Sequence, residues 1–196
     1  RKYTWLDIYK RATKFASALE KIGVGNGDTV SIMACNTPEL FEAHYSIPMT
    51  GAVINAINTR LDSKTVAYIL EHSDAKVLIV DRQFHKIIKK ALESIKRKIT
   101  IIDIDDKQAN LTDQGKIGGH EYESFLKTGD ENYQWKKPKD EWQAIALNYT
   151  SGTTGQPKGV VYHHRGSYLM SVGSVTAWNM PNKLTYSVSY THLTLP

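Results

Sequence analysis

Segments with the hydrophobic spacing of a helix alternate along the chain with short apolar segments typical of strands. Between Trp5 and Ile22 apolar residues recur every three or four positions, which is the period of an amphipathic helix. Thr4 can cap this helix and Gly23 can end it. The next apolar stretch, residues 29–34, is short and predicts a strand. The chain is therefore expected to open with a helix and then a strand.

The same alternation continues to the end of the chain. Strands separated by helices of ten or more residues indicate parallel βαβ units. We therefore expect an α/β fold, in which repeated βαβ units form a mostly parallel sheet with helices on both faces. The polar segment 105–119 is expected to mark the edge of this subdomain. The later expected helices are 36–51, 63–72, 83–95, 121–128 and 166–178, and the later expected strands are 52–57, 76–80, 99–104 and 144–149.

Length and composition narrow the class of protein. A chain of 196 residues can form one hydrophobic core or one lobe of a larger enzyme. No apolar run approaches the ~20 residues of a membrane span, so no transmembrane segment is predicted. The chain does not start with Met, which suggests truncation, and no signal peptide is recognisable. The single cysteine, Cys35, excludes an internal disulfide, so we expect a cytoplasmic location and a buried, unreactive thiol.

The charge gives little indication of a polyanionic partner. The formal net charge is +5, and the densest basic stretch, residues 86–98, alternates with apolar residues at helical spacing. Its lysines are expected to lie on a solvated helix face. A nucleic-acid surface would combine a basic stripe with aromatic side chains, so no nucleic-acid partner is predicted.

The most informative segment is the loop that follows the strand 144–149. Residues 150–159 combine three glycines, four hydroxyl side chains and Lys158. Glycines let backbone N–H groups point inward, and hydroxyls add rotatable donors, which together suit a polyphosphate. The spacing differs from the nucleotide loop G-x-x-x-x-G-K-S/T, because Gly152 and Gly155 are too close and Gly159 follows the lysine.

Residues 149–159, which read Y-T-S-G-T-T-G-Q-P-K-G, resemble without a gap the signature Y-T-S-G-T-T-G-x-P-K-G of the acyl-adenylate-forming enzymes. These are the acyl-CoA synthetases, luciferases and adenylation domains of peptide synthetases. Blocks at 3–7, 25–30 and 55–61 resemble the acyl-CoA synthetase branch that handles short or medium fatty acids or methylthio-alkanoates.

The resemblance has implications for domain organisation. It implies that residues 1–186 form part of the AMP-binding domain in the large N-terminal lobe. It also implies that the C-terminal lobe lies outside this segment, and residues 187–196 are expected to be a foreign or disordered tail without a role in the fold.

The resemblance also implies a reaction in two steps. A carboxylic acid and ATP give acyl-AMP and pyrophosphate, and coenzyme A then displaces AMP to give acyl-CoA. Mg²⁺ accompanies ATP, and the hydroxyl of Thr150 would approach the metal. His164 would act near the acyl and adenylate site, although a packing role for it stays open, and His163 is expected to be structural or exposed. The implied phosphate-binding residues are Thr150, Ser151, Gly152, Thr153, Thr154, Gly155 and Lys158.

Two alternatives stay open at this point. The acyl group could pass from acyl-AMP to a carrier protein or another acceptor, or the segment could be a non-catalytic nucleotide-binding module. The adenine- and ribose-binding segment and the catalytic lysine of the C-terminal lobe lie outside the sequence, so the fragment alone is expected to be inactive. The acid and the oligomeric state are open, with a homodimer among the alternatives.

Overall fold

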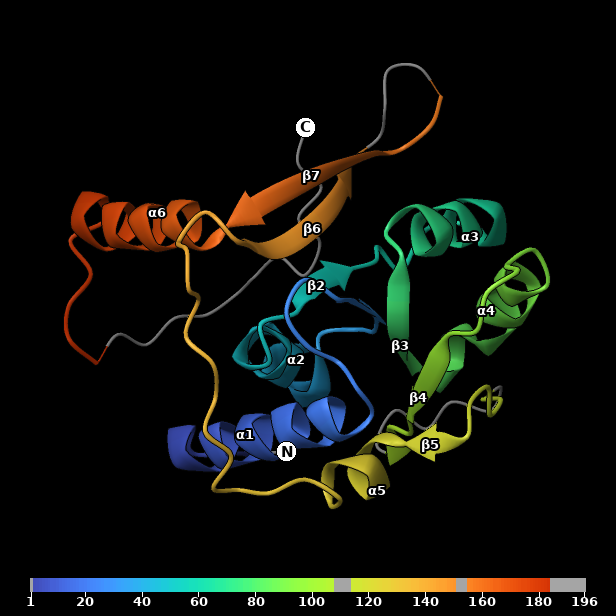
Figure 1. Cartoon of the computed structure of the whole chain (residues 1–196), viewed down its shortest axis with the longest axis horizontal. Helices are drawn as coiled ribbons and strands as arrows, with labels where there is room; N and C mark the ends of the chain where they lie inside the picture. The colour runs from blue at the N-terminus through green and yellow to red at the C-terminus, as the bar shows by residue number, and fades with distance from the viewer. Residues whose placement is uncertain (1, 108–113, 151–154, 184–196) are drawn as a thin grey trace.

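The computed structural model describes residues 2–107, 114–150 and 155–183. Helices and strands alternate along most of this range, as the hydrophobic pattern predicts (Figure 1). The helices are α1 (Trp5–Lys21), α2 (Pro38–Met49), α3 (Ser63–His72), the 3-10 helix η1 (Arg82–Phe84), α4 (His85–Leu92), α5 (Tyr122–Leu126) and α6 (His164–Ala177). The strands are β1 (Thr29–Met33), β2 (Val53–Ala56), β3 (Ala75–Asp81), β4 (Thr100–Ile104), β5 (His120–Glu121), β6 (Ala144–Thr150) and β7 (Lys158–His163).

The strands form one sheet in the order β5-β4-β3-β1-β2-β6-β7. Every neighbouring pair is parallel except β6 and β7, which are antiparallel. Parallel neighbours need crossover connections, and α2 between β1 and β2 and α4 between β3 and β4 supply two of them. The predicted α/β class and the mostly parallel sheet are therefore confirmed.

Helices cover both faces of the sheet. Strand β3 shows why, because Val77 and Ile79 belong to one hydrophobic cluster and Leu78 and Val80 belong to another. Successive side chains of a strand point to opposite faces, so a continuous apolar run needs cover on both sides. The first cluster contains residues of α1, α2 and α5, and the second contains residues of α3 and α4. Figure 1 shows these two groups of helices on opposite sides of the central strands.

Local signals at the helix ends agree with the sequence in several places. The side chain of Thr4 accepts a hydrogen bond from the backbone N–H of Asp7 at 3.1 Å, and Asp7 accepts one from the N–H of Thr4 at 2.8 Å. This capping box satisfies donors that the first turn leaves free.

No helix among the described residues is long and apolar enough to cross a membrane.

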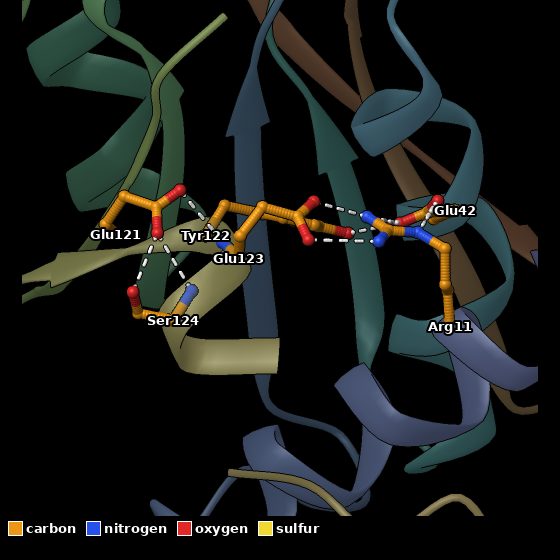
Figure 2. Close-up of polar contacts among 6 residues, drawn as sticks. All are labelled: Arg11, Glu42, Glu121, Tyr122, Glu123 and Ser124. Carbon is orange, nitrogen blue, oxygen red and sulfur yellow. Dashed lines mark hydrogen bonds and ion pairs between the residues drawn. The ribbon is translucent and has the colours of Figure 1, made fainter. Parts of the chain in front are cut away.

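A charged network joins α1, α2 and α5 beside the first cluster. Figure 2 shows Arg11 of α1 between Glu42 of α2 and Glu123 of α5. Arg11 Nε donates to Glu42 Oε1 at 2.5 Å, and Arg11 Nη1 donates to Glu123 Oε2 at 3.0 Å. The hydroxyl of Tyr122 donates to Glu42 Oε2 at 3.0 Å. The side chain of Glu42 is fully buried, and these donors compensate its charge.

Candidate functional site

The loop of the signature segment connects β6 to β7 at the edge of the sheet. Thr150 pairs with Lys158 in the antiparallel ladder, so the two residues face each other at the base of the loop. Both residues are exposed. In open α/β sheets, ligands bind beyond the carboxyl ends of the strands, and this loop leaves the carboxyl end of β6. Of the predicted phosphate-binding residues, the structure thus brings Thr150 and Lys158 together.

The far side of the loop is described only from residue 155. Gly155 has a φ of +92°, a conformation that side chains rarely adopt, which explains a glycine at this place. The predicted donors Ser151, Gly152, Thr153 and Thr154 lie outside the described residues. The role of the loop in binding phosphate therefore stays a prediction.

The two faces of β6 have different tasks. Ala146 packs against the first hydrophobic cluster, and Thr150 shares its face because the two are an even number of residues apart. Tyr149 lies on the opposite face and packs against the second cluster. Burial, together with the nearby Tyr68, raises the pKa of Tyr149 to about 12, so its hydroxyl stays protonated at neutral pH. Thr150 and Tyr149 therefore lie on opposite faces of β6, and Tyr149 packs against the body of the sheet.

His72 is a neighbour of this segment that the sequence did not indicate. Its Nδ1 lies 2.7 Å from the hydroxyl oxygen of Tyr149, although the two residues are 77 positions apart. No local pattern could have found this contact, because it depends on how α3 packs against the sheet.

His164 lies at the other end of β7 from the loop. It begins α6, directly after His163, which faces Ala144 at the start of β6. A strand rises about 3.3 Å per residue, so the six residue steps from Lys158 to His164 span a distance of order 20 Å. Partial burial lowers the pKa of His164. The structure does not bring His164 to the base of the loop, and its catalytic role stays a prediction.

The predicted structural role of His163 is confirmed. Its Nδ1 accepts a hydrogen bond from the backbone N–H of Gly166 at 2.9 Å, so His163 caps α6. The sequence predicted that this helix begins at Gly166, but it begins at His164. The two adjacent histidines are therefore divided between β7 and α6.

Cys35 corrects another prediction, because it is exposed and not buried. It follows the end of β1, where the chain leaves the sheet. Partial desolvation and the carboxylate of Asp81 raise the pKa of its thiol. A nucleophilic cysteine needs a lowered pKa, so the expectation of an unreactive thiol stands for a different reason.

Comparisons with known proteins agree with the family that the sequence of the loop resembles. The sequence profile described as AMP-binding enzyme matches residues 1–194. An acetate/butyrate–CoA ligase of Arabidopsis thaliana, whose name places it in peroxisomes, is 45% identical over 95% of this chain and 34% of its own length. An acetate–CoA ligase of Humulus lupulus is 43% identical over the same shares. The chain thus spans about a third of the length of these relatives.

Solved structures give the same picture for the fold. The chain superimposes on an anthranilate–CoA ligase bound to anthranoyl-AMP with a TM-score of 0.78 and 25% identity, over 88% of this chain and 32% of the other. A benzoate–CoA ligase of Burkholderia xenovorans gives a TM-score of 0.72 at 22% identity, over 87% of this chain and 31% of the other. The two relatives named above are acid–CoA ligases. Because the family profile matches almost the whole length of the chain, the chain belongs to the AMP-binding enzyme family.

Proposed function

We propose that this chain is the phosphate-binding part of an enzyme that converts a short-chain carboxylic acid, ATP and coenzyme A to acyl-CoA, AMP and pyrophosphate. The observation that carries the proposal is the pairing of Thr150 with Lys158 at the base of a glycine-containing loop. The names of the relatives, an acetate/butyrate–CoA ligase and an acetate–CoA ligase, support short acids as substrates.

The first step explains why a loop of this kind is needed. A carboxylate oxygen attacks the α-phosphorus of ATP, the bond to the β-phosphate oxygen breaks, and pyrophosphate leaves. Both reactants are anions, so the protein must supply positive charge and in-line positioning rather than a nucleophile of its own. Lys158 supplies the charge in our proposal, and Thr150 and the loop amides supply hydrogen-bond donors.

The second step transfers the acyl group. The sulfur of coenzyme A attacks the acyl carbon, the bond to the AMP oxygen breaks, and the thiol proton is lost. Acceptance by coenzyme A rather than by a carrier protein is supported by the names of the relatives. AMP release that depends on added coenzyme A would test this assignment.

The donor set near the loop is compatible with magnesium only in part. Mg²⁺ prefers six oxygen ligands and usually keeps several waters. The exposed hydroxyl of Thr150 offers one oxygen, and the parts of the chain that the structure describes contain no group of three histidine, cysteine or acidic residues that could hold a metal. The residues present therefore fit a metal held mainly by phosphate and water oxygens, where it would neutralise charge.

The test is Lys158→Ala in a protein that carries this segment at the length of its relatives. We expect kcat/KM for ATP–pyrophosphate exchange with acetate or butyrate to fall about 30- to 1000-fold. This corresponds to a loss of roughly 2–4 kcal/mol of transition-state stabilisation. Lys89→Ala, which removes an exposed lysine of α4, is the matched control. Unchanged exchange in Lys158→Ala would contradict the role of the loop. ATP binding by the unaltered protein without any exchange would favour the non-catalytic module.

The cytoplasmic location stays a prediction. The name of the Arabidopsis relative favours peroxisomes instead. Imaging of a tagged protein of full length in its own cells would separate the two compartments.

A further inference from the structure

The contact between α3 and β6 links the loop to the body of the sheet. His72 is the last residue of α3, and its Nδ1 lies 2.7 Å from the hydroxyl oxygen of Tyr149. The rings meet edge to face with centroids 5.7 Å apart. Tyr68, one turn earlier in α3, stacks on His72 with a centroid distance of 5.3 Å. Three rings thus form a continuous row of contacts from α3 to β6.

The hydrogen bond has a defined direction if the histidine is neutral with its proton on Nε2. Nδ1 is then an acceptor, and the hydroxyl of Tyr149 donates its proton to it. The pKa of Tyr149, raised to about 12 by burial and by Tyr68, keeps that proton in place at neutral pH.

Tyr149 is well placed to transmit this contact to the loop. It directly precedes Thr150, and it pairs with Gly159, which directly follows Lys158. A Cβ atom on residue 159 would lie 3.6 Å from the ring of Tyr149 and 3.0 Å from Leu147 Cδ1. The absence of a side chain at Gly159 therefore gives these two side chains of β6 room beside β7.

We propose that His72 is a positioning residue for the phosphate loop, which it holds through Tyr149. The inference rests on the proposed function, because it assumes that the loop binds the phosphates of ATP. The ring of Tyr149 is held by α3 on one side, and its backbone forms the base of the loop together with Gly159. The position of Thr150 and Lys158 relative to the sheet is thereby fixed by a residue that does not touch the nucleotide.

The expected effect is selective. Loss of one hydrogen bond of this kind changes an equilibrium by about 3- to 10-fold. His72→Leu should therefore weaken ATP binding and raise KM for ATP by about 3- to 10-fold, and KM for the acid should stay within twofold. Because His72 is exposed at a helix end, the substitution should leave the fold intact. A merely structural role would change the melting temperature and both KM values together.

The experiment measures ATP affinity by calorimetry and both KM values by ATP–pyrophosphate exchange, in a protein of the relatives' length. Tyr149→Phe should match His72→Leu, and the double variant should be no weaker than either single one. His72→Asn, whose amide can still accept from Tyr149, should recover most of the affinity. His44→Leu is the control, because His44 lies on α2 and its Nδ1 lies 2.8 Å from the backbone oxygen of Leu40, within the same helix.

The outcomes separate this inference from the proposed function. If the unaltered protein binds ATP but does not catalyse exchange, the proposed reaction fails, while a weaker ATP affinity in His72→Leu still supports the positioning role. If His72→Leu binds ATP as the unaltered protein does, or if the effects of His72→Leu and Tyr149→Phe simply add, the positioning role is overturned. Absence of ATP binding by the unaltered protein would overturn both.

Discussion

The centre of the sheet and its β6–β7 edge differ in how they are held. All five residues of β1 and six of the seven residues of β3 are buried, and helices cover both of their faces. By contrast, no residue of β6, β7 or α6 is buried among the described residues. The region with the signature segment therefore adds little to the core seen here. The residues of this region are determined mainly by the geometry of the loop, whereas the residues of the central strands are determined by packing in the core.

The largest expected difference between the two regions concerns aromatic residues. Phe15 of α1 is fully buried and stacks on Tyr122 with a centroid distance of 4.5 Å. Phe15→Ala should lower the free energy of unfolding by ~3–5 kcal/mol, because it leaves a cavity in the core. Trp178, at the end of α6, is 66% exposed. Trp178→Ala should therefore change the free energy of unfolding by no more than ~0.5 kcal/mol. Urea titration of the 196-residue chain measures both, and equal losses would break the comparison.

Ion pairs should show the same contrast at a smaller scale. Arg11→Ala leaves the fully buried carboxylate of Glu42 without its cation, and we expect a loss of about 3 kcal/mol in unfolding free energy. Arg165 pairs with Glu141 beside α6, and both side chains are about half exposed. Arg165→Ala should therefore cost ~0–1 kcal/mol. Urea titration at low and high salt provides the measurement. A comparable loss in both variants would show that the outer region is held as firmly as the core.

The smallest expected effect is a pH dependence at the junction of β7 and α6. Partial burial lowers the pKa of His164 in the folded protein from its usual value of 6.5. The unfolded chain then takes up a proton at a pH where the folded chain does not, so stability falls as the pH drops below about 6.5. His164→Gln should lose less stability than the unaltered chain between pH 7 and pH 5. Thermal melts across this range test the sign, and an identical loss in both proteins would contradict it.

Local patterns in the sequence predicted most of the elements. The valines and isoleucines of β3 identify a strand without any knowledge of its neighbours. The limits of α4 were harder to predict, because the apolar period continues to Ile95 while the helix ends at Leu92. Ile95 still packs against the second cluster after a tight turn, so its apolar character reflects packing and not helical structure. The strand β5 has only two residues, which is too short for any period to appear.

The parts of the candidate site that lie in one continuous run of sequence were predictable. Thr150 and Lys158 were recognisable because both ends of the loop belong to one run of sequence. The contact of His72 with Tyr149 was not, since it joins segments that only the packing of α3 brings together. The start of α6 was also missed, because histidine is not among the residues that usually cap a helix, and here the side chain of His163 does so.

The antiparallel pairing of β6 with β7 has a consequence for the order of folding. Hairpins form in roughly 1–10 μs because their strands are joined by a short loop. The parallel pairing of Ile54 with Ala146 must instead close a long stretch of chain, which is slow. We therefore expect the pairing at the base of the loop to form transiently before β6 joins the sheet, which then stabilises it. A nascent chain would carry the outline of this site before the sheet to which it belongs is complete.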